Sequence, residues 1–408
     1  MNLVIIGAQW GDEGKGKIVD YLAGKAENVI RFSGGANAGH TIVANGQTYK
    51  LHLIPSGMVY PGKQCLLGSA MVIDPEALFK ELDEIHAQGV EWEGRLFISD
   101  RAHLVLPSYK EIDKTQDSKR RFPIGTTGRG IGIAYGQKAN RDGLRICDLY
   151  DEKFYSRLTA GEKKFLDPYK EKMAPMVVNA AYWMDERKNG MNLFEGAQGA
   201  LLDLDSGTYP FVSSGFSCSA GAAIGSGTGP KNLDKILGIF KAYQTRVGNG
   251  PFPTEFKQER DGNLEHLVRE LGHEYGVTTG RARRCGYLDL VALRYACIVN
   301  SITGLVLTHI DVYDDMDTIQ ACVGYRINGR ETVEFPSRIS DLEQAEPVLK
   351  TFKGWKQPLG GVRSKKDLPK ECLEYLDFIE QFTGTPISII SVGPDRDQTF
   401  NVEEPWTK

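Results

Sequence analysis

The stretch NLVIIGAQWGDEGKGK, residues 2–17, predicts the fold of this chain. Residues 2–6 form a short apolar run that is typical of a buried strand, and a helix over 15–23 is expected after the glycines. From Gly11 the loop fits the phosphate-binding pattern G-x-x-x-x-G-K-[ST] until its last position. Ile18 stands there, where the pattern has a hydroxyl that helps to hold magnesium. We therefore expect a P-loop-like phosphate loop that lacks one usual metal ligand.

Two carboxylates, Asp12 and Glu13, lie inside this loop, whose backbone amides are expected to attract anions. A carboxylate repels a bound phosphate unless a divalent cation lies between them. Asp12 could supply the metal contact that Ile18 cannot, and it could act as a general base on the phosphoryl acceptor. Lys15 or Lys17 could hold the phosphates. The alternative is a solvated Asp-Glu turn that caps the next helix, and Glu13 in particular fits that alternative.

Strands and helices are expected to alternate along the rest of the chain. We expect strands at 29–32, 51–54, 65–67, 96–98, 304–307 and 386–390, and helices from Asp74-Pro75 to Gly89 and over 233–242, 288–299 and 370–382. This alternation indicates an α/β fold with a large, mostly parallel central sheet and helical insertions. Asn328-Gly329 lies between two strand-like runs and predicts a small antiparallel hairpin.

Composition limits the possible function classes. No linker and no low-complexity segment divides the 408 residues, so we expect one domain over 1–408 with a helix-rich insertion around 100–190. A net charge of −4 gives no basic field for nucleic acid or an anionic membrane. The seven cysteines fit neither a zinc site nor a disulfide framework, and we find no signal peptide and no apolar run of ~20 residues. A cytoplasmic protein with no membrane segment is expected.

Glycine-rich loops follow strand-like runs at five places: 7–17, 33–41, 125–132, 195–199 and 276–286. Ligands of open α/β sheets bind where such loops gather, and hydroxyls, amides and arginines in all five favour a ligand site over simple turns. His40 could hydrogen-bond a phosphoryl oxygen or act as an acid. Arg281 and Arg283 have no local acid to pair with, and their forked guanidiniums suit a carboxylate or phosphate.

Eight motifs together carry a family resemblance: QWGDEGKGK (9–17), GGANAGHT (34–41), IGTTGRGIG (124–132), FEGAQG (194–199), GTYPFVSS (207–214), GPFPTE (250–255), TTGRARRCG (278–286) and SVGPDR (391–396). They resemble the adenylosuccinate synthetase family, in the family's order and over nearly the whole chain. That family joins IMP and L-aspartate using GTP, through a 6-phosphoryl-IMP intermediate, in the AMP branch of purine biosynthesis. The resemblance implies a GTP-dependent carbon–nitrogen ligase.

The resemblance also implies site residues. Catalytic roles fall on Asp12, which takes the N1 proton of IMP, and on His40, Lys15 and Gln198; Asp12 and the Gly39 carbonyl contact one Mg²⁺ ion per subunit. GTP contacts are implied for Gly11, Asp12, Glu13, Gly14, Lys15, Gly16, Lys17, Gly39, His40, Thr41, Arg283, His309, Ile310, Asp311, Ser391, Val392 and Gly393. IMP contacts are implied for Asn37, Ala38, Thr127, Arg141, Gln198, Ser213 and Arg281, with Arg141 reaching in from the other subunit of a homodimer. Aspartate contacts are implied for Val277, Thr278, Thr279, Gly280, Arg281, Ala282 and Arg283.

Three alternatives can be compared at this point, of which the ATP donor and the guanylate acceptor stay open. His309 replaces the lysine of the family's guanine-reading T-K-x-D, so ATP is less excluded as donor, although Asp311 remains. A related ligase could take a guanylate acceptor, but its 2-amino group would crowd Asp12, which therefore favours IMP. A regulatory GTP-binding switch would need the loop hydroxyl and a D-x-x-G element, and the sequence contains neither.

Overall fold

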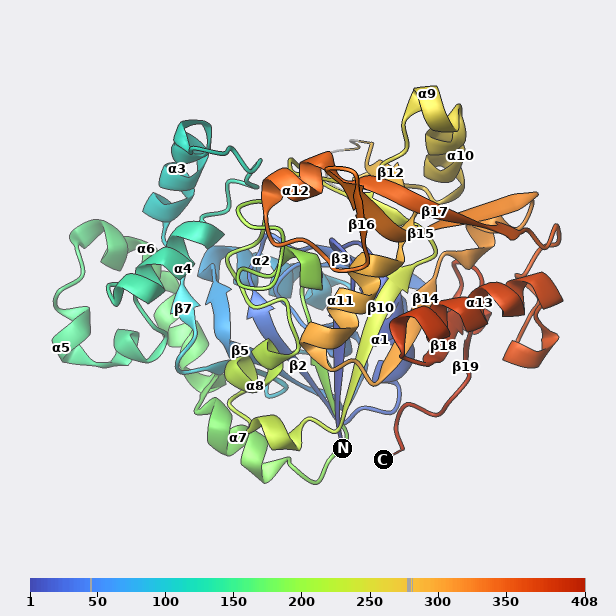
Figure 1. Ribbon diagram of the computed structural model, residues 1–408. Coiled ribbons are helices and arrows are strands. Elements are labelled where there is room, and N and C mark those ends of the chain that lie inside the picture. Colours follow the sequence, from blue (N-terminus) through green and yellow to red (C-terminus); the bar gives the residue numbers. More distant parts are fainter. Residues whose placement is uncertain (45, 277–279, 281, 408) are drawn as a thin grey trace.

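The computed structural model describes residues 1–44, 46–276, 280 and 282–407, and one large sheet forms its centre (Figure 1). Across this sheet the strands lie in the order β19 (Thr399–Asn401), β18 (Ile387–Ser391), β14 (Gly304–Thr308), β10 (Lys235–Lys241), β1 (Asn2–Gly7), β9 (Asn192–Glu195), β2 (Asn28–Gly34), β5 (Gln64–Ile73), β6 (Leu96–Ser99) and β8 (Val177–Val178), with β7 (His103–Leu104) paired to β5. The β18–β19 pair is antiparallel and the other neighbours are parallel. The expected α/β fold with a mostly parallel sheet is confirmed.

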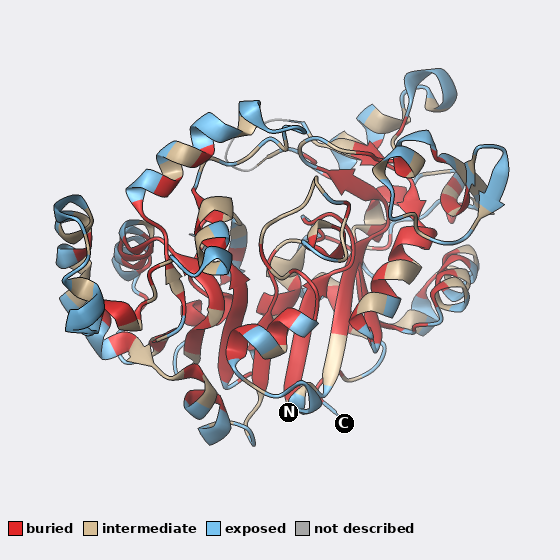
Figure 2. Ribbon diagram, turned by 60° about the vertical axis from the view of Figure 1, so that its left-hand side comes forward, coloured by how far each residue is buried: buried red, intermediate tan, exposed pale blue. Residues whose placement is uncertain are grey.

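Both faces of the sheet are covered, which explains the continuous apolar runs in its strands. All of β1 is buried, and its side chains alternate between two hydrophobic clusters. Leu3 and Ile5 belong to one cluster, and Val4 and Ile6 belong to the other. Figure 2 shows the buried strands in the middle of the molecule and exposed residues on the surrounding helices.

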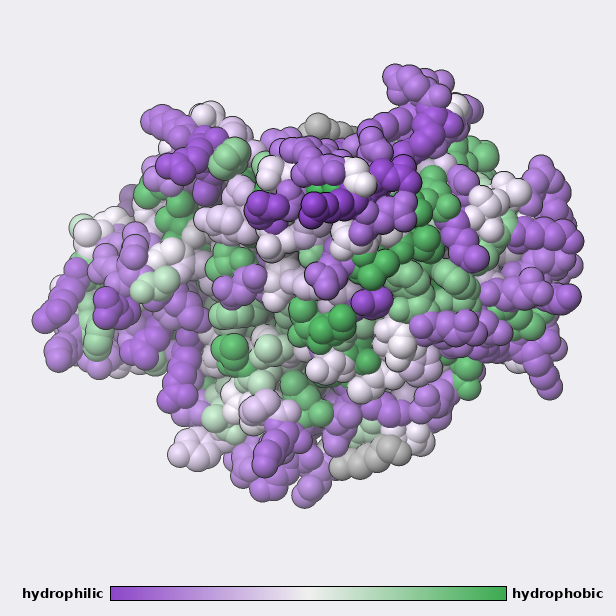
Figure 3. Space-filling model, in the orientation of Figure 1, coloured by the Kyte–Doolittle hydropathy of each residue, from purple (hydrophilic) through white to green (hydrophobic). Residues whose placement is uncertain are grey.

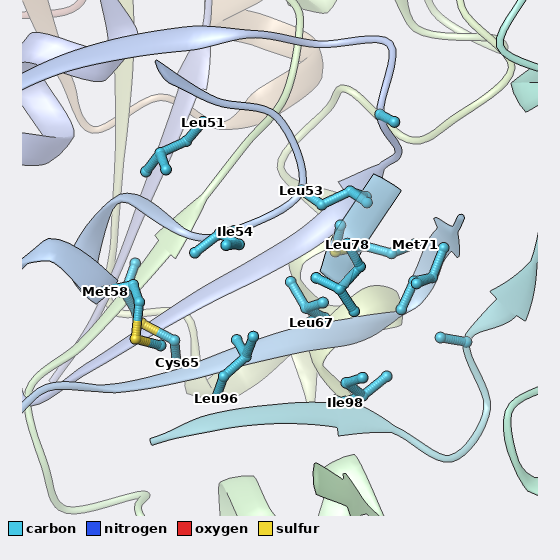
Figure 4. Close-up of a cluster of buried hydrophobic side chains, with 14 of the residues drawn as sticks. Leu51, Leu53, Ile54, Met58, Cys65, Leu67, Met71, Leu78, Leu96 and Ile98 are labelled. Carbon is cyan, nitrogen blue, oxygen red and sulfur yellow. The ribbon is translucent and has the colours of Figure 1, made fainter. Parts of the chain in front are cut away.

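Two groups of helices supply the rest of these clusters. The first cluster receives side chains from α1 (Lys15–Ala23), α2 (Pro75–Ala87), α3 (Pro107–Gln116), α4 (Ile131–Asn140) and α6 (Ala160–Met173). The second receives side chains from α7 (Ala180–Glu186), α8 (Ala220–Ser226), α10 (Leu264–Leu271), α11 (Leu290–Asn300) and α13 (Lys370–Thr383). Figure 4 shows part of the first cluster, where Leu78 of α2 shares the core with Leu67 and Met71 of β5.

Four helices lie where the sequence predicts them. The helix α1 starts at Lys15, directly after the glycine loop, and ends at Ala23. The helix α2 has Pro75 at its first position, and the carboxylate of its N-cap, Asp74, accepts a hydrogen bond from the Ala77 amide at 3.3 Å. The helices expected over 288–299 and 370–382 are α11 and α13.

The helix predicted over 233–242 is wrong, because this segment forms β10, which lies beside β1. Its apolar residues are continuous, and such a run reads equally as a buried helix or a buried strand. In the structure the side chains of this segment alternate between the two faces of the sheet, as in a strand: Ile239 belongs to the first cluster and Phe240 to the second. Gly238 brings the strand close to the chain beyond α11, since a Cβ there would collide with Ile302.

The strand predicted at 51–54 is wrong in its position. The strand β4 (Gln47–Leu51) ends there and pairs antiparallel with β3 (His40–Ala44). The amides of residues 52–54 instead donate to the buried carboxylate of Glu81, at distances of 2.8 to 3.1 Å. A side chain on α2 therefore replaces the strand partner that these backbone groups need.

The predicted hairpin at Asn328-Gly329 is confirmed. It joins β15 (Thr318–Ile327) to β16 (Arg330–Thr332), and φ is +50° at Asn328 and +76° at Gly329, as a two-residue turn of this kind requires. A small sheet forms around it with β13 (Leu288–Asp289) and β17 (Glu346–Lys353). The remaining strands are β11 (Gln244–Arg246) and β12 (Arg284–Gly286), which pair with each other. The remaining α-helices are the short α5 (Glu152–Tyr155), α9 (Gln258–Asp261) and α12 (Ile339–Gln344).

The segment around 100–190 contains the helices α3 to α7, and it also supplies β8 to the edge of the large sheet. Its outer helices project at the left of Figure 1, and Figure 3 shows mostly hydrophilic side chains on that projection. Among the described residues, no helix has both the length and the apolar character that a membrane span requires.

Candidate active site

A cavity of about 1200 Å³ lies at the carboxyl ends of β1, β9 and β2, which are neighbours in the sheet. The loops after these strands form much of its wall. The following predicted site residues line it: Gly11, Asp12, Gly14, Lys15, Gly16, Lys17, Asn37, Ala38, Gly39, His40, Thr41, Thr127, Gln198, Ser213 and Arg283. Strand order therefore brings together glycine loops that are far apart in the sequence.

The phosphate loop is held in shape from inside by Glu13. This side chain is fully buried, and its carboxylate accepts hydrogen bonds from the amides of Gln9 (3.1 Å) and Gly11 (2.8 Å) and from Lys15 Nζ (2.5 Å). A Cβ at Gly7 or Gly199 would collide with that carboxylate, so glycine is needed at both positions. The interpretation of Glu13 as part of a solvated turn is wrong.

Asp12 faces the cavity from a left-handed backbone conformation, with φ of +60°. Its side chain is 40% exposed, and its Oδ2 lies 3.0 Å from Nε of Arg283. Arg283 comes from the chain just before β12, and its Nη1 donates to the buried carboxylate of Glu274 at 2.7 Å. No sequence motif predicts this acid as a partner for Arg283, and Glu274 is a residue that sequence reasoning missed.

His40 lies opposite the phosphate loop, and its Nε2 is 3.3 Å from Oε1 of Glu195. Burial lowers the pKa of His40 to about 4, although the Glu195 carboxylate opposes this shift. The imidazole is therefore neutral at pH 7 in this state. A bound polyphosphate would add negative charge and favour the protonated form, which an acid role requires. Glu195 ends β9, and its Oε2 accepts a hydrogen bond from the Ser56 amide at 2.8 Å. No sequence motif predicts a role for this residue.

Lys17 connects the phosphate loop to the predicted guanine-reading region. Its Nζ donates to Ser391 Oγ at 2.7 Å and to the Gly393 carbonyl at 2.5 Å. Burial lowers the pKa of Lys17 to about 8, against the opposing charge of Asp311. In this state Lys17 therefore binds the loop after β18, while Lys15 stays beside Glu13.

The predicted residues after β14 and β18 do not line the cavity. Ile310 and Val392 are fully buried in the second hydrophobic cluster, so only their backbone groups are available to a ligand. His309 has φ of +56°, and its Nδ1 lies 3.4 Å from the Tyr243 hydroxyl. Burial, together with the charge of Lys241, lowers its pKa to about 4, so position 309 presents a neutral ring at pH 7.

Arg141 is exposed at the C-cap of α4 and does not line this cavity. Among the predicted aspartate contacts, Val277, Thr278, Thr279 and Arg281 lie outside the described residues. Gly280 (φ +63°) and Ala282 are described but are not part of the wall, and Ala282 forms a β-bridge with Tyr275.

Several cavity residues were missed by sequence reasoning. Arg31 is fully buried and donates to the backbone carbonyls of His52 and Gly35. The wall also includes the arginines at 120, 121 and 246 and the acids at 113 and 195. The arginines and Asp113 lie outside the glycine-rich loops. Glu195 lies within the FEGAQG motif, where the resemblance implies a role for Gln198 alone.

The donor set limits which metal this site can hold. Within the described part of the chain, no group of three His, Cys, Asp or Glu side chains is arranged to bind a metal ion. Asp12 and the Gly39 carbonyl are hard oxygen donors at the cavity wall, a set that suits Mg²⁺ bound chiefly through substrate phosphates and water.

Comparison with known proteins gives one consistent result. The family described as Adenylosuccinate synthetase matches residues 4–400. A protein of that name from Moorella thermoacetica is 45% identical, with 99% of each chain covered. One from Synechococcus elongatus is 46% identical, with 99% of this chain and 96% of the relative covered.

Solved structures agree with these relatives. The fully ligated adenylosuccinate synthetase of Plasmodium falciparum has a TM-score of 0.90 at 37% identity, covering 98% of this chain and 99% of that one. The succinoaminodeoxyadenylate synthetase of cyanophage S-2L, solved with dGMP and dATP, has a TM-score of 0.64 at 19% identity over 99% and 96% of the two chains. At that identity the second likeness shows a common fold alone.

Proposed function

The chain belongs to the adenylosuccinate synthetase family, and we propose the residue roles by which its cavity performs the family's reaction. The enzyme is a carbon–nitrogen ligase that joins IMP and L-aspartate and uses GTP. Its products are adenylosuccinate, GDP and phosphate. The observation that carries the assignment of roles is a carboxylate, Asp12, facing the cavity from within a phosphate-binding loop.

Asp12 acts as the base on the purine. The 6-oxygen of IMP is a poor nucleophile while N1 keeps its proton. When Asp12 accepts that proton, the electron pair moves to the 6-oxygen, which forms a bond to the γ-phosphorus as the bond to GDP breaks. The amine of aspartate then adds at C6. The bond between C6 and the 6-oxygen breaks, and that oxygen leaves as part of the phosphate. A base for this sequence must lie beside both the purine and the triphosphate, which is where the loop presents Asp12.

Positive charge and donors around the loop stabilise the phosphoryl transfer. The loop at 11–17, through the backbone amides that Glu13 does not bind, and the Lys15 ammonium surround the phosphates. His40 donates a proton or a hydrogen bond to the transferring group. The negative charge of Glu195, 3.3 Å from His40 Nε2, favours the protonated form of the imidazole. Gln198 hydrogen-bonds the purine 6-oxygen, and the side chains of Asn37, Thr127 and Ser213 hold the IMP phosphate.

The remaining contacts follow from the family resemblance. Residues 277–283 bind the carboxylates of aspartate, and Arg283 is the described member of this set that reaches the cavity. Asp311 reads guanine, and the loop at 391–393 packs beside the base. Lys17 of the phosphate loop donates a hydrogen bond to Ser391 of that loop. Asp12 and Gly39 would hold Mg²⁺, which neutralises phosphate charge when bound.

We also propose that the enzyme works as a homodimer. Arg141 is exposed and does not line the cavity of its own chain, which fits an arginine that serves the neighbouring active site. A cytoplasmic location stays a prediction from the cysteine pattern and composition.

One experiment tests acceptor and donor together. Purified protein is mixed with IMP, L-aspartate, Mg²⁺ and either GTP or ATP, and adenylosuccinate is followed by its absorbance. We expect product with GTP and little with ATP. Product from a guanylate but not from IMP would refute the acceptor, and equal rates with ATP would refute the donor assignment.

A further inference from the structure

A buried chain of charges runs from the second hydrophobic cluster to the cavity. Lys241 and Glu274 form an ion pair whose side chains are 0% and 1% exposed, with 2.7 Å between Nζ and Oε1. The same Oε1 accepts from the Tyr243 hydroxyl at 2.6 Å, and Oε2 accepts from Arg283 Nη1 at 2.7 Å. Arg283 then reaches Asp12, so two cations and two carboxylates alternate along this chain.

The two contacts of Arg283 differ in quality. Its contact with Glu274 is a well-formed hydrogen bond. Its contact with Asp12 is short, but the Nε–H does not point at the carboxylate, and within the described residues Nε has no hydrogen-bond partner. A buried donor without a partner is costly. One edge of the guanidinium is therefore fixed, and the other is available for a better acceptor.

Glu274 also holds the backbone of Arg283. The Arg283 amide donates to the Glu274 carbonyl at 2.9 Å, and Arg269 Nε donates to the Arg283 carbonyl at 3.1 Å. Burial alone would raise the pKa of Glu274, but the charge of Lys241 lowers it to about 2, so this anchor stays ionised at pH 7. The backbone of Arg283 and the Nη1 edge of its guanidinium are therefore held in place by hydrogen bonds. The edge that carries Nε, which we call the outer edge, makes no hydrogen bond through Nε within the described residues.

We propose that Glu274 is a positioning residue for the amino-acid substrate: it fixes Arg283 so that the outer edge of the guanidinium donates hydrogen bonds to a substrate carboxylate. The proposal rests on the function given above and adds to it a residue that touches no substrate. Without this anchor, Arg283 is free to turn and pair fully with Asp12. Binding of aspartate and the availability of the Asp12 carboxylate would then both decline.

The first test is Glu274→Gln, which keeps the shape of the side chain and removes its charge. We expect the KM for aspartate to rise roughly 10- to 100-fold and kcat to fall, because a misplaced guanidinium binds its carboxylate poorly. The KM for IMP should change less than about 3-fold, and the KM for GTP should rise far less than that for aspartate. This variant leaves Lys241 buried without its carboxylate. The double variant Lys241→Met/Glu274→Gln removes both charges of the pair, and we expect it to fold.

Asp261→Asn is the matched control. Asp261 is also a buried carboxylate that binds an arginine (Arg260, 2.7 Å) and a tyrosine hydroxyl (Tyr287, 2.8 Å), but none of the three lines the cavity. It should lower the melting temperature and leave every KM unchanged. If Glu274→Gln and the double variant behave like this control, the proposal is overturned. Absence of product from the unaltered enzyme would instead refute the proposed function.

Discussion

The carboxylate of Glu13 offers the sharpest test of how the phosphate loop is built. In Glu13→Gln the side chain keeps its size but loses its charge, and its NH₂ group must face either a backbone amide or the Lys15 ammonium. The natural carboxylate accepts three hydrogen bonds in a fully buried site. Hydrogen bonds to a charged group contribute about 1.5–3 kcal/mol each, and the amide oxygen retains part of them.

We therefore expect Glu13→Gln to lower the free energy of unfolding by about 3–5 kcal/mol, as for other broken buried pairs. Urea unfolding followed by circular dichroism measures this as a lower midpoint with an unchanged slope. The control is Glu404→Gln, which breaks the exposed Lys25–Glu404 pair and should cost less than about 1 kcal/mol. The KM for GTP should also rise roughly 10- to 100-fold, because the loop amides lose their positions. Equal midpoints for the two variants would refute the internal role of Glu13.

Three further predictions concern the proposed site. Asp12→Ala should abolish adenylosuccinate formation while circular dichroism stays native; substantial residual turnover would remove the base assignment. Arg283→Leu should raise the KM for aspartate far more than that for GTP, and equal effects on both would mean that Arg283 has another role. Burial lowers the pKa of His40 in the folded protein from 6.5 to about 4. Its contribution to the free energy of unfolding is therefore complete above pH 6.5 and is lost as the pH falls toward 4. The ligand-free protein should lose stability on the order of 1–2 kcal/mol more than His40→Gln between pH 7 and pH 5, as measured by urea midpoints; parallel losses would argue against a buried neutral imidazole.

Local patterns predicted much of this fold. The glycine loop before Lys15, the Asp74-Pro75 helix start and the Asn328-Gly329 hairpin each depend on residues that are neighbours in the sequence. The segment around β10 was misread because an apolar run that is buried on both faces has no period to separate strand from helix.

The candidate site shows the same division. Glycine motifs pointed to the residues that line the cavity, because each motif is contiguous. The groups that hold those residues in place were missed, since they come from distant parts of the chain: Glu274 meets Lys241 across 33 positions, and Lys17 meets Ser391 across 374. Charge pairing at such separations leaves no local signal.

The position of β1 has a consequence for how the enzyme is made. During translation β1 is made long before its partners β9 and β10, whose residues lie beyond position 190. At about 5–20 residues per second, the nascent phosphate loop waits roughly 10–50 s before β10 is synthesised. Its Lys17 meets Ser391 only after another 374 residues have been made. A chain that stops before β10 has been made is therefore expected to have no assembled nucleotide site.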